Sequence, residues 1–387
     1  MSQSYHETNK PVNDVLWPEP SKADLRRHGD TLPLRVSDVD FEPYRDIIET
    51  RLNEYLDQEE AKKVLIQKRK VNGQVELGEW DEPTDPSIVI PKHLRDRRRT
   101  GRPPIDPVLM FRIVFLGVLT RLSDQALAFH IVDNRSFRIF LGVDPGFYVS
   151  RQVIWKYRNI FVKSKACKEI FERHVTKLRE SKLLSEDGPM VVDGSFVEAR
   201  IQRNSPETNK KIKMGLDPIW IWFNENVRRQ KDADASWTEK GGVKHFGYKL
   251  HVLVDADSKL IIYGSTTTAR THDSQALEGL LSYDDKGRQL YADSAYVGRR
   301  LEEVTDDFGV IRQFCERGYR NHPITTIQKL NNKTKAKTRS RVEHVFAFIE
   351  MSMGGSFVRS VGFERAEGYQ WLTMLAYNIC RQEILRR

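Results

Sequence analysis

Three acidic residues have the chemical type and the surroundings expected of metal ligands. Asp193 follows three apolar residues in a predicted strand over 190–198, and Asp293 ends a second predicted strand over 288–293. Glu343 lies later in the chain, in a segment with helical periodicity. A buried, unpaired carboxylate costs about several kcal/mol, so an acid carried by a buried strand is normally neutralised by a cation.

Carboxylate oxygens are the ligands that a hard ion such as Mg²⁺ prefers. Phosphoryl transfer on two ions, about 3.5–4 Å apart, uses one to activate the attacking oxygen and the other to stabilise the leaving oxygen. One bridging and two flanking carboxylates are a minimal arrangement for this chemistry. We therefore expect Asp193, Asp293 and Glu343 to be ligands. The structural alternatives are a turn cap or a buried ion pair for either aspartate, and an ion pair with Arg339 for Glu343.

The elements predicted after residue 185 would bring these acids together. Strands are predicted over 190–198, 246–255, 259–267, 288–293 and 309–314. Helices are predicted over 271–281, over 296–306 with Ser294 as the N-cap, around Glu343 after a basic loop, and over 366–385. A meander followed by alternating strands and helices indicates an α/β, ribonuclease H-like fold, a mixed sheet with flanking helices.

Two further regions are predicted before this catalytic domain of 185–387. Residues 1–100 form an arm with one helix, from about 38 to 70, and a basic linker. Residues 101–184 form an all-helical, helix-turn-helix-like domain. Its predicted helices cover 107–122, 123–132, 135–141, 151–159 and 163–182. An ordinary helical bundle is the alternative. Residues 201–245 are too long for a hairpin loop and are predicted to be an insertion, with DNA contact as one hypothesis.

The composition favours a nucleic acid partner. Lys plus Arg exceeds Asp plus Glu by 63 to 54, which gives a net charge of +9 and favours a polyanion over a membrane. Three widely separated cysteines have neither zinc nor disulfide spacing. The apolar run 108–120 is too short for a bilayer and contains Arg112. We expect a cytoplasmic, nucleoid-associated protein with no membrane partner.

Basic residues in three places are candidates for DNA contact, each with a solvated surface as the alternative. The linker contains Arg97, Arg98, Arg99 and Arg102, in a stretch similar to an AT-hook except that Thr100 replaces its first arginine. The predicted helix 151–159 contains Arg151, Lys156 and Arg158. The segment before Glu343 contains Lys333, Lys335, Lys337, Arg339 and Arg341.

Three other polar residues are candidates for positions near the site. His272 and Asp273 follow a predicted strand. His272 would contact substrate or position a carboxylate. The structural alternative is that Asp273 caps the next helix. Glu350 lies seven residues after Glu343 and so on nearly the same helix face. It is therefore a rival or an assistant to Glu343.

Several stretches, in this order, match one known family. They are Gly101-Arg-Pro-Pro-Ile-Asp-Pro-Val-Leu-Met110, Val192-Asp-Gly-Ser-Phe-Val-Glu-Ala199, Phe246-Gly-Tyr-Lys-Leu-His251, Thr267-Thr-Ala-Arg-Thr-His-Asp273, Tyr291-Ala-Asp-Ser-Ala-Tyr296 and Arg341-Val-Glu-His344. With them the chain resembles DDE transposases of bacterial insertion sequences, in particular the insertion-sequence-five group of the insertion-sequence-four-like superfamily. The resemblance covers about residues 100–380.

The resemblance implies a ribonuclease H-like domain in which Asp193, Asp293 and Glu343 hold two Mg²⁺ ions per active site, with Mn²⁺ as a substitute. It implies cleavage at transposon ends and transfer of the 3′-OH into target DNA. The partners would be double-stranded DNA, as terminal inverted repeats and target, and a second copy or more of the chain. Ala336 and Glu350 stand where the family often has tyrosine and lysine.

Two other functions stay open at this point. The first is a non-catalytic, sequence-specific DNA-binding protein derived from a transposase, which the missing lysine favours and the three acids oppose. The second is a plain metal-dependent nuclease on the same fold, which would cut DNA without joining the ends to a target. A tyrosine recombinase is disfavoured, because its Arg/His constellation is not apparent beside Tyr291 and Tyr296.

Overall fold

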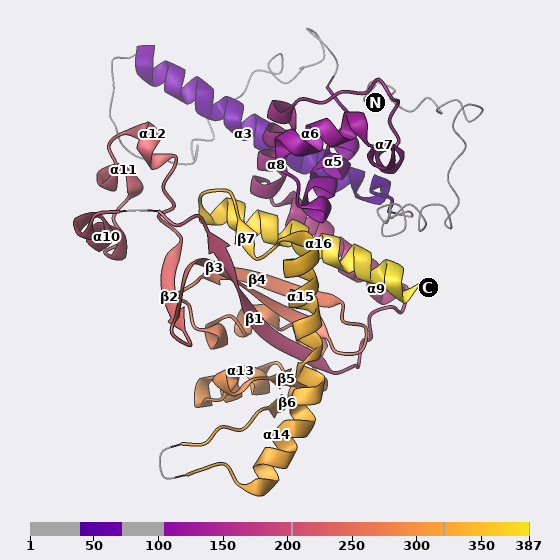
Figure 1. Cartoon of the computed structure of the whole chain (residues 1–387), viewed down its shortest axis with the longest axis vertical. Helices are drawn as coiled ribbons and strands as arrows, with labels where there is room; N and C mark the ends of the chain where they lie inside the picture. Colours follow the sequence, from indigo (N-terminus) through magenta and orange to yellow (C-terminus); the bar gives the residue numbers. More distant parts are fainter. Residues whose placement is uncertain (1–38, 72–103, 203, 320–321, 387) are drawn as a thin grey trace. The chain divides into compact units, whose positions relative to one another are not determined.

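The computed structural model describes residues 39–71, 104–202, 204–319 and 322–386, with the side chains of 63–71 excepted. The chain divides into two compact units, one of residues 1–117 and 122–166 and one of residues 118–121 and 167–387 (Figure 1). Within the described part of the chain, no helix is long and apolar enough to cross a bilayer.

All regular elements in the described residues of the first unit are helices. They are η1 (Glu42–Tyr44), α3 (Arg45–Val71), α5 (Pro107–Thr120), α6 (Asp124–Asp133), α7 (Arg135–Leu141) and α8 (Arg151–Lys163). The aromatic rings of Phe41, Phe111 and Phe115 pack in its core, with the Phe41 centroid 5.3 Å from Phe111 and 5.0 Å from Phe115. Such buried rings contribute most of the apolar area that holds a small helical unit together.

The helix boundaries in this unit follow from local sequence. The Ser123 side chain accepts a hydrogen bond from the backbone N–H of Ala126 and caps α6, as a serine at this position should. Gly142 ends α7 with φ +67°, a conformation that glycine adopts at little cost. The predicted helices over 107–122, 123–132, 135–141 and 151–159 are thus present, the last one extended to Lys163.

The predicted division into three domains stays a prediction. Helix α9 (Ala166–Glu180), which the sequence analysis assigned to the region 101–184, belongs to the second unit. Most of residues 1–100 lies outside the described ranges. The helical segments above do not by themselves establish a DNA-binding domain, which also stays a prediction.

The second unit contains a mixed sheet with helices, as predicted. Its strands are β1 (Met190–Ala199), β2 (Ser236–Lys240), β3 (Val243–Asp255), β4 (Ile261–Thr268), β5 (Gln289–Ala292), β6 (Ile311–Phe314) and β7 (Phe357–Val358). The order is β2-β3-β1-β5-β6, with β4 also paired to β3 and β7 also paired to β1. Strand β1 is antiparallel to β3 and parallel to β5, and β5 is parallel to β6.

Helices and short turns connect these strands. They are α10 (Pro206–Lys213), α11 (Pro218–Ile221), α12 (Glu225–Arg228), η2 (Asp273–Gln275), η3 (Glu278–Leu280), η4 (Tyr283–Asp285), η5 (Ser294–Tyr296), α13 (Arg299–Asp307), α14 (Thr326–Arg339), α15 (Arg341–Met353) and α16 (Phe363–Leu385). In Figure 1, α15 crosses the sheet and continues the line of α14. Helix α16 is tied to β4, because Asn378 both donates to and accepts from the backbone of Ile261 at 2.8 Å.

One edge of β1 is open in its middle. Strand β5 pairs with Met190 and Val191, and β7 pairs with Glu198 and Ala199. Between these pairings no described strand covers that edge, whereas β3 pairs with the opposite edge from residue 190 to 198. Residues 192–197 of β1 therefore face the helices on this side, and Asp193 is among them.

Three predicted elements differ from the structure. Residues 271–281 form only the turns η2 and η3 instead of a helix, and Gly279 in this short segment disfavours a longer helix. The helix predicted over 296–306 begins at Arg299, and Asp293, not Ser294, caps the turn before it. The predicted basic loop is helix α14, which a capping box at Thr325 and Gln328 starts.

Candidate active site

Asp193 and Asp293 lie at matching positions of neighbouring parallel strands. Met190 pairs with Leu290 and Val191 with Tyr291. Extended by two residues along each strand, this register places Asp193 opposite Asp293. Adjacent strands are about 4.8 Å apart, so the end of β5 brings the second acid beside the first.

The Asp193 carboxylate is largely buried, with 21% of its side chain exposed. Its Oδ1 accepts the backbone N–H of Gly194 at 2.8 Å. Burial, and to a smaller degree the neighbouring Asp293 carboxylate, raise the pKa of Asp193 to about 6. The Gly194 hydrogen bond and the Arg339 guanidinium oppose this rise. Because two adjacent carboxylates in a poorly solvated place repel each other, binding of a cation there would be favourable.

Arg339 links Asp193 to Glu343. Its guanidinium lies 3.5 Å from Asp193 Oδ2 and 3.2 Å from Glu343 Oε1. Arg339 ends α14 and Glu343 lies in the first turn of α15. The helical periodicity around Glu343 predicts an apolar stripe of Val342, Val345, Phe346 and Ile349. Of these, Val342, Val345 and Ile349 are buried and Phe346 is half-buried, while Glu343 beside them is 59% exposed. The ion pair between Arg339 and Glu343, an alternative from the sequence, is therefore present, but the same arginine also reaches Asp193.

These residues fit a divalent cation in chemical type. Three carboxylates supply oxygen donors only, which suits Mg²⁺, and a cationic group, the Arg339 guanidinium, already lies within 3.5 Å of two of them. Within the described ranges, however, no three His, Cys, Asp or Glu side chains are grouped so that they could hold a metal ion. Ligation by all three acids would therefore require Arg339 to leave Asp193 or Glu343.

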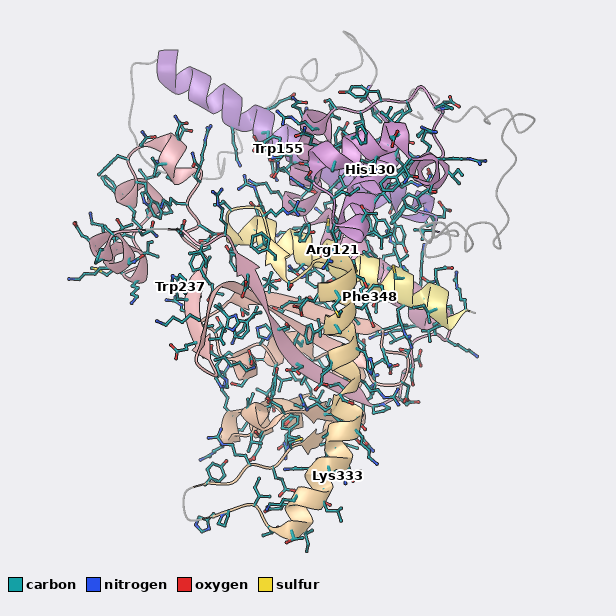
Figure 2. The ribbon with its side chains drawn as sticks, in the orientation of Figure 1. Arg121, His130, Trp155, Trp237, Lys333 and Phe348 are labelled. Atoms are coloured by element: carbon teal, nitrogen blue, oxygen red, sulfur yellow. The ribbon has the colours of Figure 1, made fainter. Side chains whose placement is uncertain are left out.

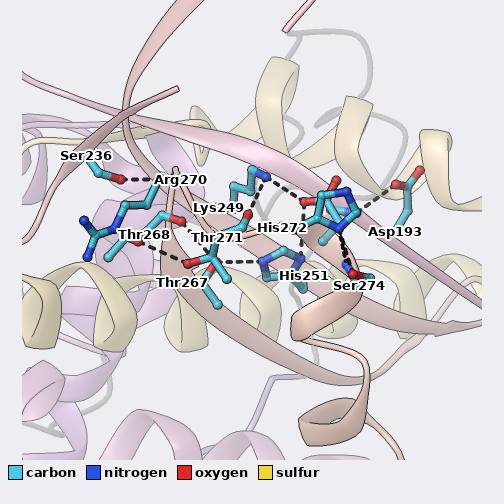
Figure 3. A network of polar contacts seen from close by, with 12 residues as sticks. Asp193, Ser236, Lys249, His251, Thr267, Thr268, Arg270, Thr271, His272 and Ser274 are labelled. Atoms are coloured by element: carbon cyan, nitrogen blue, oxygen red, sulfur yellow. Dashed lines mark hydrogen bonds and ion pairs between the residues drawn. The ribbon is translucent and has the colours of Figure 1, made fainter. Parts of the chain in front are cut away.

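A polar network packs against the backbone beside Asp193. The Lys249 ammonium donates to Asp273 Oδ1 at 2.8 Å and to the carbonyl of Thr271 at 2.7 Å. His251 is fully buried, and its Nε2 lies 2.8 Å from Thr267 Oγ1 (Figure 3). A Cβ at Gly194 would lie 2.8 Å from His251 Nδ1 and 3.3 Å from Asp273 Oδ1. Position 194 therefore has to be glycine while this network is in place.

Two buried polar atoms of the network region are not satisfied. His251 Nδ1 and the Tyr296 hydroxyl have no hydrogen-bond partner within the described chain. Burial lowers the pKa of His251 to about 4, so the imidazole is neutral at pH 7. Burial, and then the carboxylates of Asp193, Asp273 and Asp293, raise the pKa of the Tyr296 phenol. Tyr296 is therefore a neutral phenol close to these acids.

Asp273 and His272, the predicted near-site pair, have different surroundings. Asp273 belongs to the network at Gly194. His272 is exposed, and its Nδ1 contacts Ser274 as the cap of η2. Glu350 is exposed on α15, about two turns beyond Glu343, and within the described residues its carboxylate forms no ion pair. The structure thus brings only Asp273 of these three into a polar network next to Asp193.

The basic residues before Glu343 divide between two faces of α14. Lys333 and Lys337, four residues apart, are exposed. Lys335 and Arg339 point to the sheet, because Lys335 donates to the carbonyl of Phe314 at 2.9 Å and Arg339 contacts Asp193. Figure 2 labels Lys333 on this helix. Arg341 is exposed at the start of α15.

In the first unit, Arg151 and Lys156 are exposed on α8. Arg158 forms an ion pair with Asp124 at 2.6 Å and so contributes less to a basic face than the sequence suggested. Trp155, between them, is 56% exposed. The linker arginines Arg97, Arg98, Arg99 and Arg102 lie outside the described residues.

The sequence analysis did not identify Lys249, His251 and Tyr296 as site residues. All three lie in stretches that carried the family resemblance, so a signal was present. Strand register places Lys249 and His251, whereas Tyr296 lies in the turn η5 that follows Asp293. His251 is the cross-strand partner of Gly194, and Lys249 is the partner of Phe196. Only the pairing of β1 with β3 shows that these residues lie next to Asp193.

Two family models match the chain. Residues 185–379 match the family described as "Transposase DDE domain", and residues 46–159 match a "Transposase domain" of otherwise unassigned role. The first match covers half of the chain and includes all three acids. The second covers most of the described helices of the first unit, from the second residue of α3 to the ninth residue of α8.

Two solved structures show a remote likeness. One is piggyBac transposase in a synaptic complex with hairpin DNA, at 11% identity and a TM-score of 0.38, covering 74% of this chain and 69% of that one. The other is a pre-cleavage Mos1 transpososome, at 10% identity and a TM-score of 0.17, covering 87% and 97%. TM-scores this low do not establish a shared fold, so no property of these two proteins is assigned to this chain.

Proposed function

We propose that this chain, which belongs to the family of transposases with a DDE domain, cleaves DNA at transposon ends and transfers the 3′-OH into target DNA. The observation that carries the proposal is the register of β1 and β5, which sets Asp193 beside Asp293, with Glu343 joined to Asp193 through Arg339. Acids so arranged suit phosphoryl transfer assisted by divalent cations.

Asp193, Asp293 and Glu343 would hold the Mg²⁺ ions, two per site, which supply activation of the attacking oxygen and stabilisation of the leaving oxygen. Asp193, beside Asp293 in strand register and joined to Glu343 through Arg339, would be the central ligand of the three. Arg339 compensates the charge of Asp193 and Glu343, and cations held by these acids would take over that role. The Asp273–Lys249 pair supports the backbone of Asp193 at Gly194.

The strand order supports a ribonuclease H-like assignment for the second unit, as the sequence predicted. An antiparallel meander of β1, β3 and β4 is followed by β5 and β6, both parallel to β1. Lys333 and Lys337 on the exposed face of α14, with Arg341, are the proposed contacts to the DNA backbone. We also propose that two or more copies assemble on the paired transposon ends.

A non-catalytic, DNA-binding descendant of a transposase is the second candidate. Two observations favour it. Glu350 occupies the place of a family lysine, and no three ligand side chains of the described chain are grouped for a metal ion. Under this alternative, the Arg339 ion pairs would be permanent.

The proposed function is tested by cleavage of a labelled duplex that carries the element's end. The wild-type chain is expected to nick the boundary with Mg²⁺ and not with EDTA. Asp293→Asn should lower the rate at least about a thousandfold, because it removes a ligand next to Asp193. Asp257→Asn, in the exposed turn after β3, is the matched control and should cleave normally.

Addition of target DNA then separates a transposase from a plain nuclease. Joining of the freed 3′ ends to the target supports strand transfer, and cleavage without joining supports a nuclease. Specific binding of the end without cleavage, with either Mg²⁺ or Mn²⁺, would reject catalysis and favour the DNA-binding alternative.

A further inference from the structure

One exposed cation near the three acids is Lys240, the last residue of β2. Its Nζ lies 5.8 Å from the ring centre of Phe196, within the distance at which an ammonium is attracted to an aromatic face. Phe196 lies on β1, three residues after Asp193. Within the described residues, the Lys240 side chain forms neither an ion pair nor a hydrogen bond.

The local sequence fixes the end of β2. Gly241 and Gly242 have φ +60° and +80°, and a two-residue hairpin turn favours positive φ at both positions, which glycine adopts at little cost. Lys240 and Val243 are the pair that closes this turn. Lys240 therefore lies at the tip of a tight hairpin, where backbone pairing sets its position.

The hairpin also bends back toward β1. Val243, opposite Lys240, and Lys249, opposite Phe196, are six residues apart on β3, which is about 20 Å in a straight strand. The Lys240 Nζ is nevertheless 5.8 Å from the Phe196 ring, so β3 bends between these two positions. Gly247 lies in that interval with φ +148°, and a Cβ there would collide with the backbone of β1. Glycine at this position permits the bend that brings Lys240 to β1.

Three basic side chains surround the Phe196 ring, and the described chain supplies an acidic partner for two of them. The His245 ring stacks on it at 4.1 Å, and His245 Nδ1 lies 3.2 Å from Glu198 Oε1. The ammonium of Lys249, whose ion pair is given above, lies 5.4 Å from the ring centre. The third side chain, Lys240, is the one that has no such partner among the described residues.

The Lys240 charge acts on the acids themselves. It is one of the groups that lower the pKa of Asp193, against the effect of burial. Glu239, its neighbour on β2, points to the other face of the hairpin, because successive residues of a strand alternate. A cation that the described chain leaves without an acidic partner, in electrostatic reach of Asp193, suits a phosphate of the substrate.

The spacing along β1 indicates which phosphate this is. Phe196 and Asp193 are three residues apart, which is about 10 Å in a strand. One strand of DNA carries a charge about every 3.4 Å of helix axis, so this distance corresponds to about three nucleotides. We propose that Lys240 binds a DNA phosphate about three nucleotides from the one cleaved at the acids, with the Phe196 ring holding its ammonium in place. The inference rests on the proposed function, because it takes DNA as the substrate of the acids.

The test is binding of the full chain to an element-end duplex in EDTA, over a range of salt concentrations. Lys240→Met should weaken binding about 3- to 15-fold at about 50 mM salt and lower the slope of log K against log salt by about 0.9, as expected for one lost phosphate contact. Lys240→Arg should keep the wild-type slope. Lys244→Met is the matched control, because Lys244 is exposed on the other face of the same hairpin. It should keep the slope and change binding less than about twofold.

Phe196→Leu tests the part played by the ring. This variant keeps the Lys240 charge and removes the aromatic face beneath it, so it should weaken binding about 2- to 5-fold with an unchanged salt slope. Wild-type affinity in Phe196→Leu would contradict the positioning of Lys240 by the ring.

Uncharged methylphosphonate linkages are then placed one at a time on both sides of the element boundary. At one position, about three nucleotides from the boundary, the linkage should weaken wild-type binding by the factor seen for Lys240→Met and should not weaken that variant further. A wild-type slope in Lys240→Met, an equal loss in Lys244→Met, or no such position would overturn the inference. Normal Mg²⁺-dependent cleavage by the wild type in that case would leave the proposed function standing. Binding that follows these expectations without any cleavage would instead reject the proposed function.

Discussion

Two clusters of acids, each with one arginine, lie close together along β1 and differ in how completely their charges are satisfied. In the first, Arg288 lies between Asp255 and Asp285, at 3.6 and 3.1 Å, and all three side chains are at most 3% exposed. Asp255 is the cross-strand partner of Met190, three residues before Asp193. This cluster is structural.

Its acids are bonded to the protein itself. Asp255 Oδ2 accepts the N–H and the hydroxyl of Ser258, and Asp285 Oδ2 accepts the N–H of Ser282. Arg288 also donates to the carbonyl of Gly188 at 2.9 Å. A buried ion pair is tolerated when such hydrogen bonds satisfy most of its atoms, and the two atoms here without a hydrogen bond, Asp255 Oδ1 and Arg288 Nη2, face each other at 3.6 Å.

In the second cluster, one arginine pairs with two acids, and a third acid lies next to Asp193. Arg339 contacts Asp193 and Glu343 from a side chain that is 27% exposed, and Asp293 raises the pKa of Asp193. The comparison shows what separates a stabilising cluster from a candidate metal site in one sheet. In the candidate metal site, one arginine is shared by two acids beside a third, and the side chains of Asp193 and Glu343 stay in reach of solvent.

The largest expected effect is the removal of the buried arginine. Arg288→Met should destabilise the second unit by about 3–5 kcal/mol, because it leaves Asp255 and Asp285 buried without a cation. The melting temperature should then fall by about 10 °C or more, measured by differential scanning calorimetry. A fall of less than about 3 °C would mean that the two clusters are energetically alike.

A smaller effect, of opposite sign, is expected at the candidate metal site. The pKa of Asp193 is raised from 3.8 to about 6 in the fold. Its protonated form therefore stabilises the protein fully below pH 3.8, and this contribution is lost as the pH rises through about 6. Asn does not titrate, so Asp193→Asn should become more stable than the wild type by about 1–3 kcal/mol between pH 4 and 8.

This difference is measured by thermal melts in EDTA at both pH values, with Asp257→Asn as the control that should show no such trend. The difference in stability between Asp193→Asn and the wild type should grow as the pH rises. A difference that stays constant or shrinks would contradict the assignment of an under-compensated acid to position 193.

The smallest effect is expected for the second arginine. Arg339→Met should cost only about 0.5–1 kcal/mol, because partly exposed ion pairs contribute little. Urea unfolding of this variant beside Arg288→Met gives the ranking directly. If Arg339→Met proved the more destabilising of the two, Arg339 would be a structural residue and the comparison would fail.

Much of the site could be predicted from the sequence, because its signals are local. A short apolar run precedes each of Asp193 and Asp293. Asp193 lies within β1 and Asp293 directly after β5, and the parallel pairing of these strands aligns the two acids. The stripe of Val342, Val345 and Ile349 also fixed the position of Glu343 on the edge of α15. The resemblance added the order of the acids, and the family match supports the transposase assignment.

The parts that were not predicted depend on tertiary contacts or on weak local signals. Helix α14 has no buried residue, so it lacks the apolar periodicity by which a helix is recognised. The segment 271–281 has buried leucines that suggest a helix but packs as separate turns. Lys249 lies beside the strand of Asp193 through the pairing of β3 with β1, which the sequence alone does not reveal, and Tyr296 lies in the short turn η5 after Asp293.

The central claim is that Asp193, Asp293 and Glu343 bind divalent cations, and a metal titration tests it most directly. Mn²⁺ bound by the full chain is measured by electron paramagnetic resonance for the wild type, Asp293→Asn and Asp257→Asn. We expect saturable binding that Asp293→Asn weakens at least about tenfold and Asp257→Asn leaves unchanged. Equal Mn²⁺ affinity in the wild type and Asp293→Asn, or no binding by either, would contradict the account.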